Sequence, residues 1–135
     1  MKPHTKTAVA LISSLLCLFL LASCATPNAT PEKAIESLEN EGYTVKEKQV
    51  AGLIHFGEGI DAAFEASKKN AKKDITDKLY VIYYESNSAA DTAWKSVEPL
   101  AASYRPDEID EGDWLVRKSG RMIFFGTRDA AYAAN

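Results

Sequence analysis

The chain has 135 residues, of which 16 are basic and 19 are acidic, so that its formal net charge is −3. This length is enough for one domain with its own hydrophobic core and too short for two. The mildly acidic balance provides no basic stripe for nucleic-acid phosphates, and we therefore expect no nucleic-acid partner.

The first 23 residues have the pattern of a bacterial signal peptide. Lys2, His4 and Lys6 precede an uncharged run of fifteen residues, 8–22, that is rich in Leu, Ile, Val and Phe. This run has the length of a signal-peptide core and is shorter than the roughly 20 residues of a membrane-spanning helix. It leads into Leu-Ala-Ser-Cys at 21–24, which closely resembles the lipobox of bacterial lipoproteins.

The lipobox resemblance implies a lipid anchor at Cys24. In bacterial lipoproteins this cysteine carries a diacylglycerol on its sulfur and becomes the first residue of the mature chain. Two acyl chains hold a protein on a membrane stably, whereas a single chain holds it only marginally. We therefore expect a protein anchored to the cell membrane by lipid and facing outside the cytoplasm. The alternative is ordinary secretion after cleavage near Ala25.

Removal of the leader, residues 1–23, would leave 14 basic and 19 acidic residues, a net charge of −5, and Cys24 as the only cysteine. A lipidated Cys24 leaves no thiol for a disulfide or for a cysteine-based metal cluster. We accordingly expect no metal and no other cofactor. Residues 24–30 are predicted to be the lipidated cysteine and a short polar tether, and residues 31–135 a single domain.

The domain is predicted to begin with a helix that starts at Pro31 and ends at Gly42. A strand follows over 43–50. Residues 59–67 have apolar positions that satisfy both helical and strand spacing, and we favour a strand followed by a hairpin loop at 68–74. The four lysines of this loop either contact anionic lipid head groups or form a solvated turn, and the solvated turn is favoured.

The second half of the domain continues the same mixture of strands and helices. The expected elements are a strand at 79–84, a helix at 88–101, strands at 113–117 and 121–125, and a final Ala-rich helical turn. Asn87 or Ser88 is expected to cap the helix, and Pro99 either kinks it or starts a second one. The pattern predicts an α+β domain, a mainly antiparallel sheet of about five strands with two or three helices packed on it.

Three stretches of the domain carry a broader resemblance. They read LENEGYTV at 38–45, YVIYYESNSAADTAW at 80–94 and RKSGRMIFFGTRDAA at 117–131. Together with the lipobox, they are similar to small, poorly characterised single-domain lipoproteins of Gram-positive bacteria. The three stretches are packing and turn patterns, so the resemblance implies a fold and a location but no catalytic residue.

Two of the predicted strands are apolar on both faces. A half-buried antiparallel strand alternates apolar and polar residues, but 79–84 and 122–125 are apolar throughout. Either helices cover both faces of the sheet, or one face presents aromatic side chains to an envelope protein or ligand. For the second case, the candidate binding surface consists of Tyr80, Tyr84 and Phe124.

The catalytic signals are weak. His55 is the only histidine after residue 23, and it is a candidate general base for which the sequence supplies no partner. The acidic residues of 107–113 do not have EF-hand spacing, and a solvated loop is favoured over a calcium site. No phosphate-binding loop, nucleophile elbow or HExxH pattern is present in the sequence.

The sequence therefore predicts a lipid-anchored protein outside the cytoplasm, and we favour a binding or interaction module of the cell envelope over an enzyme. The alternative is a small envelope hydrolase that uses His55 and a carboxylate. A pocket bringing His55 together with a carboxylate would favour the hydrolase. An apolar groove or an exposed aromatic patch would favour the binding module.

Overall fold

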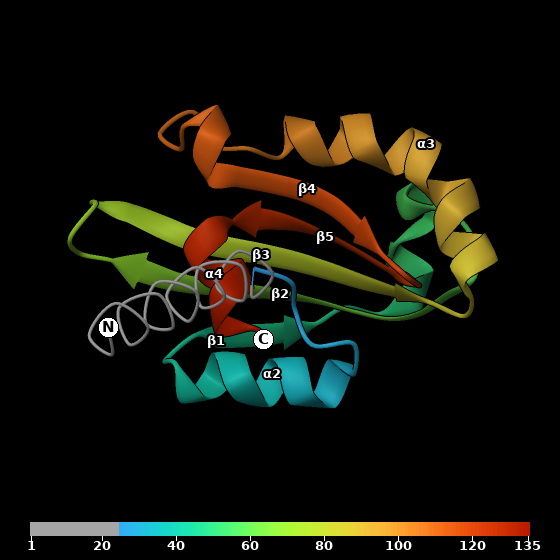
Figure 1. Ribbon diagram of the computed structural model, residues 1–135, viewed down its shortest axis with the longest axis horizontal. Helices are drawn as coiled ribbons and strands as arrows, with labels where there is room; N and C mark the ends of the chain where they lie inside the picture. Colours follow the sequence, from blue (N-terminus) through green and yellow to red (C-terminus); the bar gives the residue numbers. More distant parts are fainter. Residues whose placement is uncertain (1–24) are drawn as a thin grey trace, which may run out of the picture.

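The computed structural model describes residues 25–135 and contains a five-stranded antiparallel sheet with helices packed on it (Figure 1). The strands are β1 (Thr44–Glu47), β2 (Ile60–Asn70), β3 (Ile75–Tyr84), β4 (Trp114–Ser119) and β5 (Met122–Thr127). The helices are α2 (Pro31–Asn40), α3 (Asn87–Ser103) and α4 (Arg128–Ala133), with 3-10 turns η1 (Val50–Gly52), η2 (Ile54–Phe56) and η3 (Glu111–Asp113). The predicted α+β class is confirmed.

The strands lie in the order β1-β2-β3-β5-β4, and every neighbouring pair is antiparallel. Directly opposed residues form rows across the sheet, and one row contains Glu65 on β2, Tyr80 on β3 and Phe125 on β5. Side chains that are directly opposed on neighbouring strands lie on the same face of a sheet. The row therefore places a carboxylate, a phenol and a phenyl ring side by side.

The strand favoured for 59–67 is confirmed, and it extends to Asn70. A register shift between Ile60 and Ala62 interrupts the alternation that the sequence suggests. As a result, Ile60 packs in the core on one face of the sheet and Phe64 packs in the core on the other. Ile60 and Phe64 thus pack in different cores, although strict alternation along the strand would place both side chains on the same face.

The lysine-rich segment is the end of a long hairpin rather than the loop expected over 68–74. Lys68 and Lys69 still pair with β3 in the sheet, so the turn contains only residues 71–74. The pairing continues past the apolar part of both strands because backbone hydrogen bonds extend the ladder. Lys68 and Lys69 remain exposed, whereas Asp77 is buried and accepts a hydrogen bond from the Asn70 side chain at 3.0 Å. The exposed hairpin end thus carries four lysines in ordered positions.

Helix α3 begins one residue earlier than expected. Its cap is Ser86, whose side chain accepts a hydrogen bond from the Ala89 amide at 3.1 Å, and not Asn87 or Ser88. Pro99 lies inside α3, which continues without a second start to Ser103. The 17-residue helix is held against the sheet by buried alanines and by Val97.

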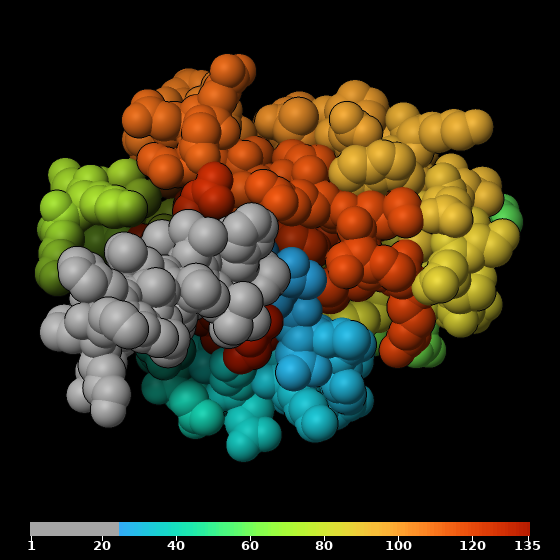
Figure 2. Space-filling view, viewed as in Figure 1, coloured from blue at the N-terminus to red at the C-terminus, as the bar shows by residue number. Residues whose placement is uncertain are grey.

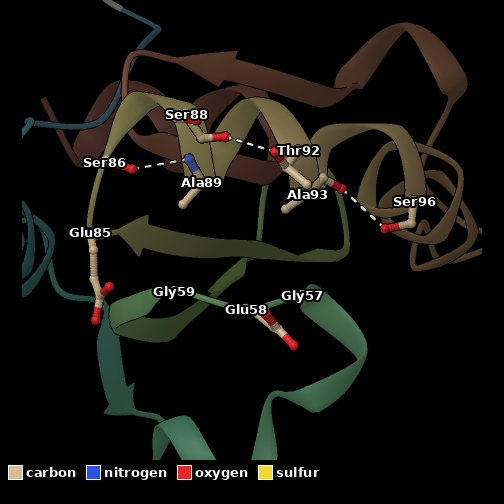
Figure 3. A pocket seen from close by; sticks show the side chains of 10 residues that line it. All are labelled: Gly57, Glu58, Gly59, Glu85, Ser86, Ser88, Ala89, Thr92, Ala93 and Ser96. Atoms are coloured by element: carbon tan, nitrogen blue, oxygen red, sulfur yellow. Dashed lines mark hydrogen bonds between the residues drawn. The ribbon is translucent and has the colours of Figure 1, made fainter.

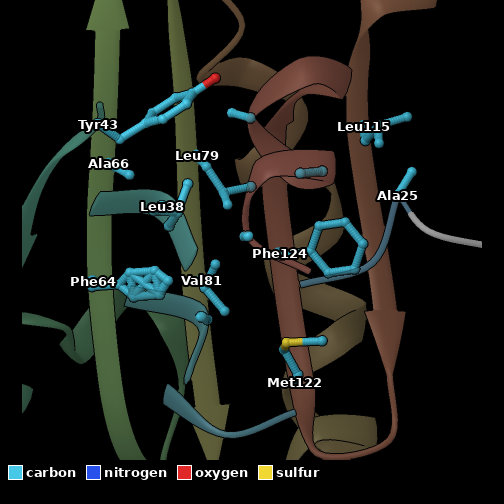
Figure 4. Packing of buried hydrophobic residues seen from close by; sticks show 14 of the residues in the cluster. Ala25, Leu38, Tyr43, Phe64, Ala66, Leu79, Val81, Leu115, Met122 and Phe124 are labelled. Atoms are coloured by element: carbon cyan, nitrogen blue, oxygen red, sulfur yellow. The ribbon is translucent and has the colours of Figure 1, made fainter. Parts of the chain in front are cut away.

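The sheet is covered on both faces, and each face has its own core. The α2/α4 face contains Leu79 and Val81 of β3 together with Phe124 of β5, and Leu38 of α2 packs onto them (Figure 4). The α3 face contains buried residues of η2, α3 and the opposite sides of the same strands. Figure 1 shows α2 and α3 on opposite sides of the sheet. The two-faced apolar strands are therefore explained largely by cover from helices on both sides.

Residues 25–30 pack on the domain and do not form the polar tether expected from their composition. Ala25 is 5% exposed and belongs to the core of the α2/α4 face. The Asn28 amide donates to the Ala134 carbonyl at 2.9 Å, and the Asn135 side chain donates to the Thr26 carbonyl at 2.8 Å. In Figure 2 these first described residues, in blue, lie directly against the body of the domain.

The predicted signal peptide and the predicted lipid site at Cys24 belong to residues 1–24 and lie outside the described residues. Within residues 25–135, no helix combines the length and the apolar character that crossing a bilayer requires.

Gly126 provides a test of how closely β5 approaches β3. A Cβ at this position would overlap the Lys78 carbonyl oxygen and lie 2.7 Å from the Leu79 Cα. Because both neighbours are backbone atoms of a paired strand, Gly126→Ala is expected to destabilise the domain by about 3 kcal/mol or more. The free energy of unfolding of residues 25–135, measured in urea, checks this.

The matched control for this prediction is Gly112→Ala. Nothing lies within 4 Å of a Cβ at Gly112, so its free energy of unfolding should change by less than about 0.5 kcal/mol. Equal stabilities for the two variants would show that the β3–β5 approach is not as close as described.

Candidate functional site

A pocket of about 330 Å³ lies on the α3 face, between the row that contains Glu65 and Tyr80 and the segment 50–56. It exists because α3 packs mainly over β4, β5 and β3, while η1 packs against β2. The part of the face above β2 and β3 is therefore covered by a short irregular segment instead of a helix. The pocket wall combines an aromatic cluster with a polar rim.

The aromatic cluster consists of Phe56, Tyr80, Tyr104 and Phe125. The Tyr80 and Phe125 rings are stacked, with centroids 4.9 Å apart and planes inclined by 12°. The Tyr104 ring lies 5.5 Å from that of Tyr80 and 5.4 Å from that of Phe125. Phe56 lies 6.0 Å from both Tyr104 and Phe125. These separations are typical of interacting aromatic rings.

Four different elements bring these rings together. Tyr80 and Phe125 are opposed residues of β3 and β5, Tyr104 caps the end of α3, and Phe56 ends η2. Phe56 and Phe125 are buried, whereas Tyr80 is half-buried and Tyr104 is 41% exposed. The cluster therefore has a buried base and an open side that a ligand can reach.

The polar rim is formed by Lys48, Glu65 and the Tyr80 hydroxyl. Lys48 Nζ lies 2.9 Å from Glu65 Oε2. Burial, together with the negative charge of Glu65 and the hydrogen bond between the two side chains, raises the pKa of Tyr80 to about 12, and burial is the largest of these causes. Tyr80 therefore remains a neutral donor to a carboxylate at physiological pH. The rim offers a donor and an acceptor at one end of an aromatic wall.

The structure does not bring together the three residues of the surface that the sequence suggests. Tyr80 lines the pocket, but Tyr84 and Phe124 are completely buried. Tyr84 lies in the core of the α3 face, where its hydroxyl donates to the Phe56 carbonyl at 2.6 Å, and Phe124 lies in the core of the other face. Tyr84 and Phe124 therefore offer no binding surface to a partner.

Several pocket residues could not be recognised in the sequence. Tyr104 stands alone in a polar stretch after a predicted helix, and Phe56 lies in a segment without clear periodicity. The pairing of Glu65 with Tyr80 depends on the register of β2 against β3. The only local signal was the exposed aromatic character of Tyr104 near a helix end.

His55 also lines this pocket, as does the Glu65 carboxylate. The arrangement thus places a candidate base and an acid on one cavity wall. However, Glu65 is already engaged by Lys48 and Tyr80, and His55 is exposed in the middle of η2. No serine, threonine or cysteine is among the described residues that line the pocket. The described wall therefore lacks the hydroxyl or thiol nucleophile of a serine, threonine or cysteine hydrolase.

A second, more open groove of about 650 Å³ lies beside the first turns of α3 (Figure 3). Three of its hydroxyl groups bond within or at the start of the helix: Thr92 donates to the Ser88 carbonyl, Ser96 donates to the Ala93 carbonyl, and Ser86 accepts from the Ala89 amide. The side chains of Glu58 and Glu85 point away from the helix in Figure 3. The groove presents no convergent set of free polar groups to a ligand.

Metal binding finds no support in the described part of the chain. Residues 25–135 contain no group of three or more His, Cys, Asp or Glu side chains placed to hold a metal ion. The acidic stretch 107–113 is mostly exposed and includes the short turn η3.

The elevated pKa of Tyr80 predicts a specific loss of stability in alkali. Between the ordinary pKa of 10.0 and the folded value of about 12, the unfolded chain releases the Tyr80 proton while the folded domain retains it. The contribution of Tyr80 to the free energy of unfolding is therefore constant below pH 10 and falls as the pH rises from 10 to 12. The free energy of unfolding of Tyr80→Phe should fall less steeply across that window than that of the parent domain. Identical slopes would contradict the buried, Glu65-bonded state of Tyr80.

Comparisons of the chain with protein families, with curated proteins and with solved structures find no match.

Proposed function

We propose that the chain is a lipid-anchored binding module of the cell envelope that takes a small ligand into the aromatic pocket. The ligand has a flat apolar body, which packs against the rings, and a polar end, which meets the rim. The observation that carries the proposal is the cluster of four rings around Tyr104, open on one side and edged by the Lys48–Glu65 ion pair.

The size and lining of the pocket support a small ligand. Pockets for small molecules have volumes of about 300 to 1,000 Å³, are mostly apolar, and contain a few polar groups that fix orientation. The volume of about 330 Å³ lies at the lower end of that range. An aromatic wall with one ion pair at its edge matches this description.

The positions of the exposed apolar side chains, among the described residues, also support a binding site at the aromatic pocket. Val50 is 46% exposed, Ile54 78% and Tyr104 41%, and these are the large hydrophobic residues that residues 25–135 expose most. Val50 and Ile54 belong to η1 and η2, whose neighbours Gly52, Leu53 and Phe56 line the pocket. Exposed apolar residues gathered at a concave site mark binding surfaces. A ligand in the pocket would shield Tyr104 from water, whereas Val50 and Ile54 lie next to the pocket and do not line it.

The polar rim supports a ligand with both apolar and polar parts. The Lys48 ammonium can donate to an acidic or carbonyl group of the ligand, and the Glu65 carboxylate can accept from a hydroxyl or amine. Lys48 is 41% exposed at its side chain and can reorient at small loss of energy. The pair is therefore suited to orienting a ligand and contributes less to its affinity than the rings.

A hydrolase is the second candidate, favoured by the presence of His55 and Glu65 on the same wall. In such an enzyme His55 would activate water directly, because the described pocket lining has no serine, threonine or cysteine. This role requires Glu65 to leave Lys48 in order to orient the histidine. The binding function needs no such rearrangement and is preferred.

The ligand proposal is tested with 8-anilinonaphthalene-1-sulfonate, a flat apolar probe with an anionic end, and residues 25–135. We expect saturable binding, seen as a rise in probe fluorescence, because the rings exclude water from the probe. Tyr104→Ala removes an aromatic contact worth about 1 to 1.5 kcal/mol and should weaken binding about tenfold.

Ile54→Ala is the matched control, since Ile54 is the most exposed large apolar residue described and does not line the pocket. Its affinity for the probe should equal that of the parent domain. Equal weakening by both variants would indicate adsorption to an apolar surface and would contradict a defined pocket.

The proposed anchor is tested by Cys24→Ala in the full chain, expressed in a bacterium that processes lipoproteins. We expect the variant to lose metabolic lipid labelling and to move from the membrane fraction to the soluble fraction, because the sulfur that carries the diacylglycerol is absent. Cys17→Ala is the matched control, since this cysteine lies in the apolar run of the leader. Continued lipid labelling of Cys24→Ala would contradict the anchor.

A further inference from the structure

The segment that follows Cys24 is fastened to the folded domain from its first described residue. Ala25 is buried in the core of the α2/α4 face. The Tyr83 hydroxyl donates to the Asn28 carbonyl at 2.8 Å, and the Asn28 amide donates to the Ala134 carbonyl at 2.9 Å. The Asn135 side chain adds a third bond, to the Thr26 carbonyl. The segment is therefore part of the fold and has little freedom to act as a flexible connection.

Because residues 25–30 are fixed on the domain, a lipid on Cys24 would lie close to the domain surface. A free segment of six residues could extend to about 20 Å and let the domain rotate above a membrane. With residues 25–30 fixed, Cys24 is a single peptide unit, about 3.8 Å between Cα atoms, from a buried residue. A diacylglycerol at Cys24 would hold this part of the domain surface at the level of the lipid head groups.

The buried position of Ala25 also determines which face lies toward the bilayer. Ala25 packs in the α2/α4 face, together with Leu115 and Phe124 (Figure 4). The aromatic pocket, with Tyr80 and Phe125, lies on the α3 face. The sheet thus separates the two.

We propose that residues 25–30 are a rigid mount, which turns the α2/α4 side of the domain toward an anionic bilayer and the aromatic pocket away from it. The proposal rests on the lipid anchor proposed above. It adds that the pocket has a fixed orientation and receives its ligand from the side of the external medium.

The charges around the mount indicate which edge approaches the lipid. The hairpin residues 68–74 carry four exposed lysines and one exposed acid, Asp74, and the groove that Lys69 and Lys72 line beside Ala133 of α4 also contains Glu41, Asp77 and Asp129. Lysines close to an anionic surface are attracted to it. Helix α2 instead exposes Glu36 and Glu39. The hairpin, and not α2, is therefore the edge expected nearest the head groups.

The mount itself is tested by amide hydrogen exchange of residues 25–135 in solution. The Asn28 amide, bonded to Ala134, should exchange at least about a hundredfold more slowly than an unstructured amide. A double variant, Tyr83→Phe with Asn135→Ala, removes two of the three bonds and should lose most of this protection while the amides of β3 and β5 keep theirs. Exchange of Asn28 at the unstructured rate in the parent domain would overturn the proposal, whether or not the chain is lipidated.

The orientation is tested with the full lipidated protein in vesicles that contain an anionic lipid and a head-group-attached quencher. A lipidated Cys24 has no free thiol, so a fluorophore can be attached to one introduced cysteine, at Ala71→Cys on the hairpin or Gly52→Cys at the pocket. Both positions are exposed, and Gly52 has open space around it. We expect clear quenching at position 71 and little at position 52.

A matched variant carries ten Gly and Ser residues inserted between Cys24 and Ala25, which leaves the mount and the lipid intact but separates them. In this variant the difference in quenching between positions 71 and 52 should be lost. Equal quenching at both positions without the insertion would overturn the fixed orientation while the anchor stands. A protein that carries no lipid and stays in solution would overturn the anchor and the orientation with it.

Discussion

The structure depends on covering both faces of β3. This central strand turns Leu79, Val81 and Tyr83 toward one core and Ile82 and Tyr84 toward the other, and each of them is at most 3% exposed. Full burial of such side chains stabilises a fold by about 1.5 to 3 kcal/mol each. Neither face can therefore be left to solvent, and the chain needs two separate covers. α2, α4 and residues 25–30 form one cover, while α3 and the segment 50–56 form the other. The pocket occurs where the second cover passes from a helix to a short irregular segment.

Much of the architecture follows from local patterns, because those patterns report local physics. Gly42 ends α2 with a φ of +87°, and Gly120 turns the β4–β5 hairpin with a φ of +60°, conformations that favour glycine at both sites. The apolar and β-branched character of 79–84 is sufficient to predict a strand. In contrast, the register shift after Ile60 and the alignment of Glu65 with Tyr80 and Phe125 depend on pairing between strands, which no short pattern specifies. The candidate site could be predicted only in part for this reason: Tyr80 was identified, while its neighbours come from β2, β5, η2 and the end of α3.

The position of the N-terminal segment, residues 25–30, also depends on contacts with residues distant in the sequence, which local patterns do not predict. Its short polar composition is typical of a tether, and nothing nearby in the sequence suggests a partner. The group that binds Thr26 belongs to Asn135, 109 positions later in the chain. Ser37 of α2 completes the arrangement by donating to the Ala133 carbonyl at 2.7 Å. Composition thus describes what a segment can do in isolation, and the fold decides whether it remains isolated.

Two neighbouring hydroxyl groups in β3 have separate tasks. The side chains of Tyr83 and Tyr84 leave the strand on opposite sides; the first holds the backbone of Asn28 and the second holds the backbone of Phe56, in the wall of the pocket. Phenylalanine at either position would retain most of the apolar packing and remove only one hydrogen bond, to the N-terminal segment at position 83 or to the pocket wall at position 84. Losing a single oxygen atom at one of two consecutive residues would therefore loosen either the N-terminal segment or the pocket wall, independently of the other.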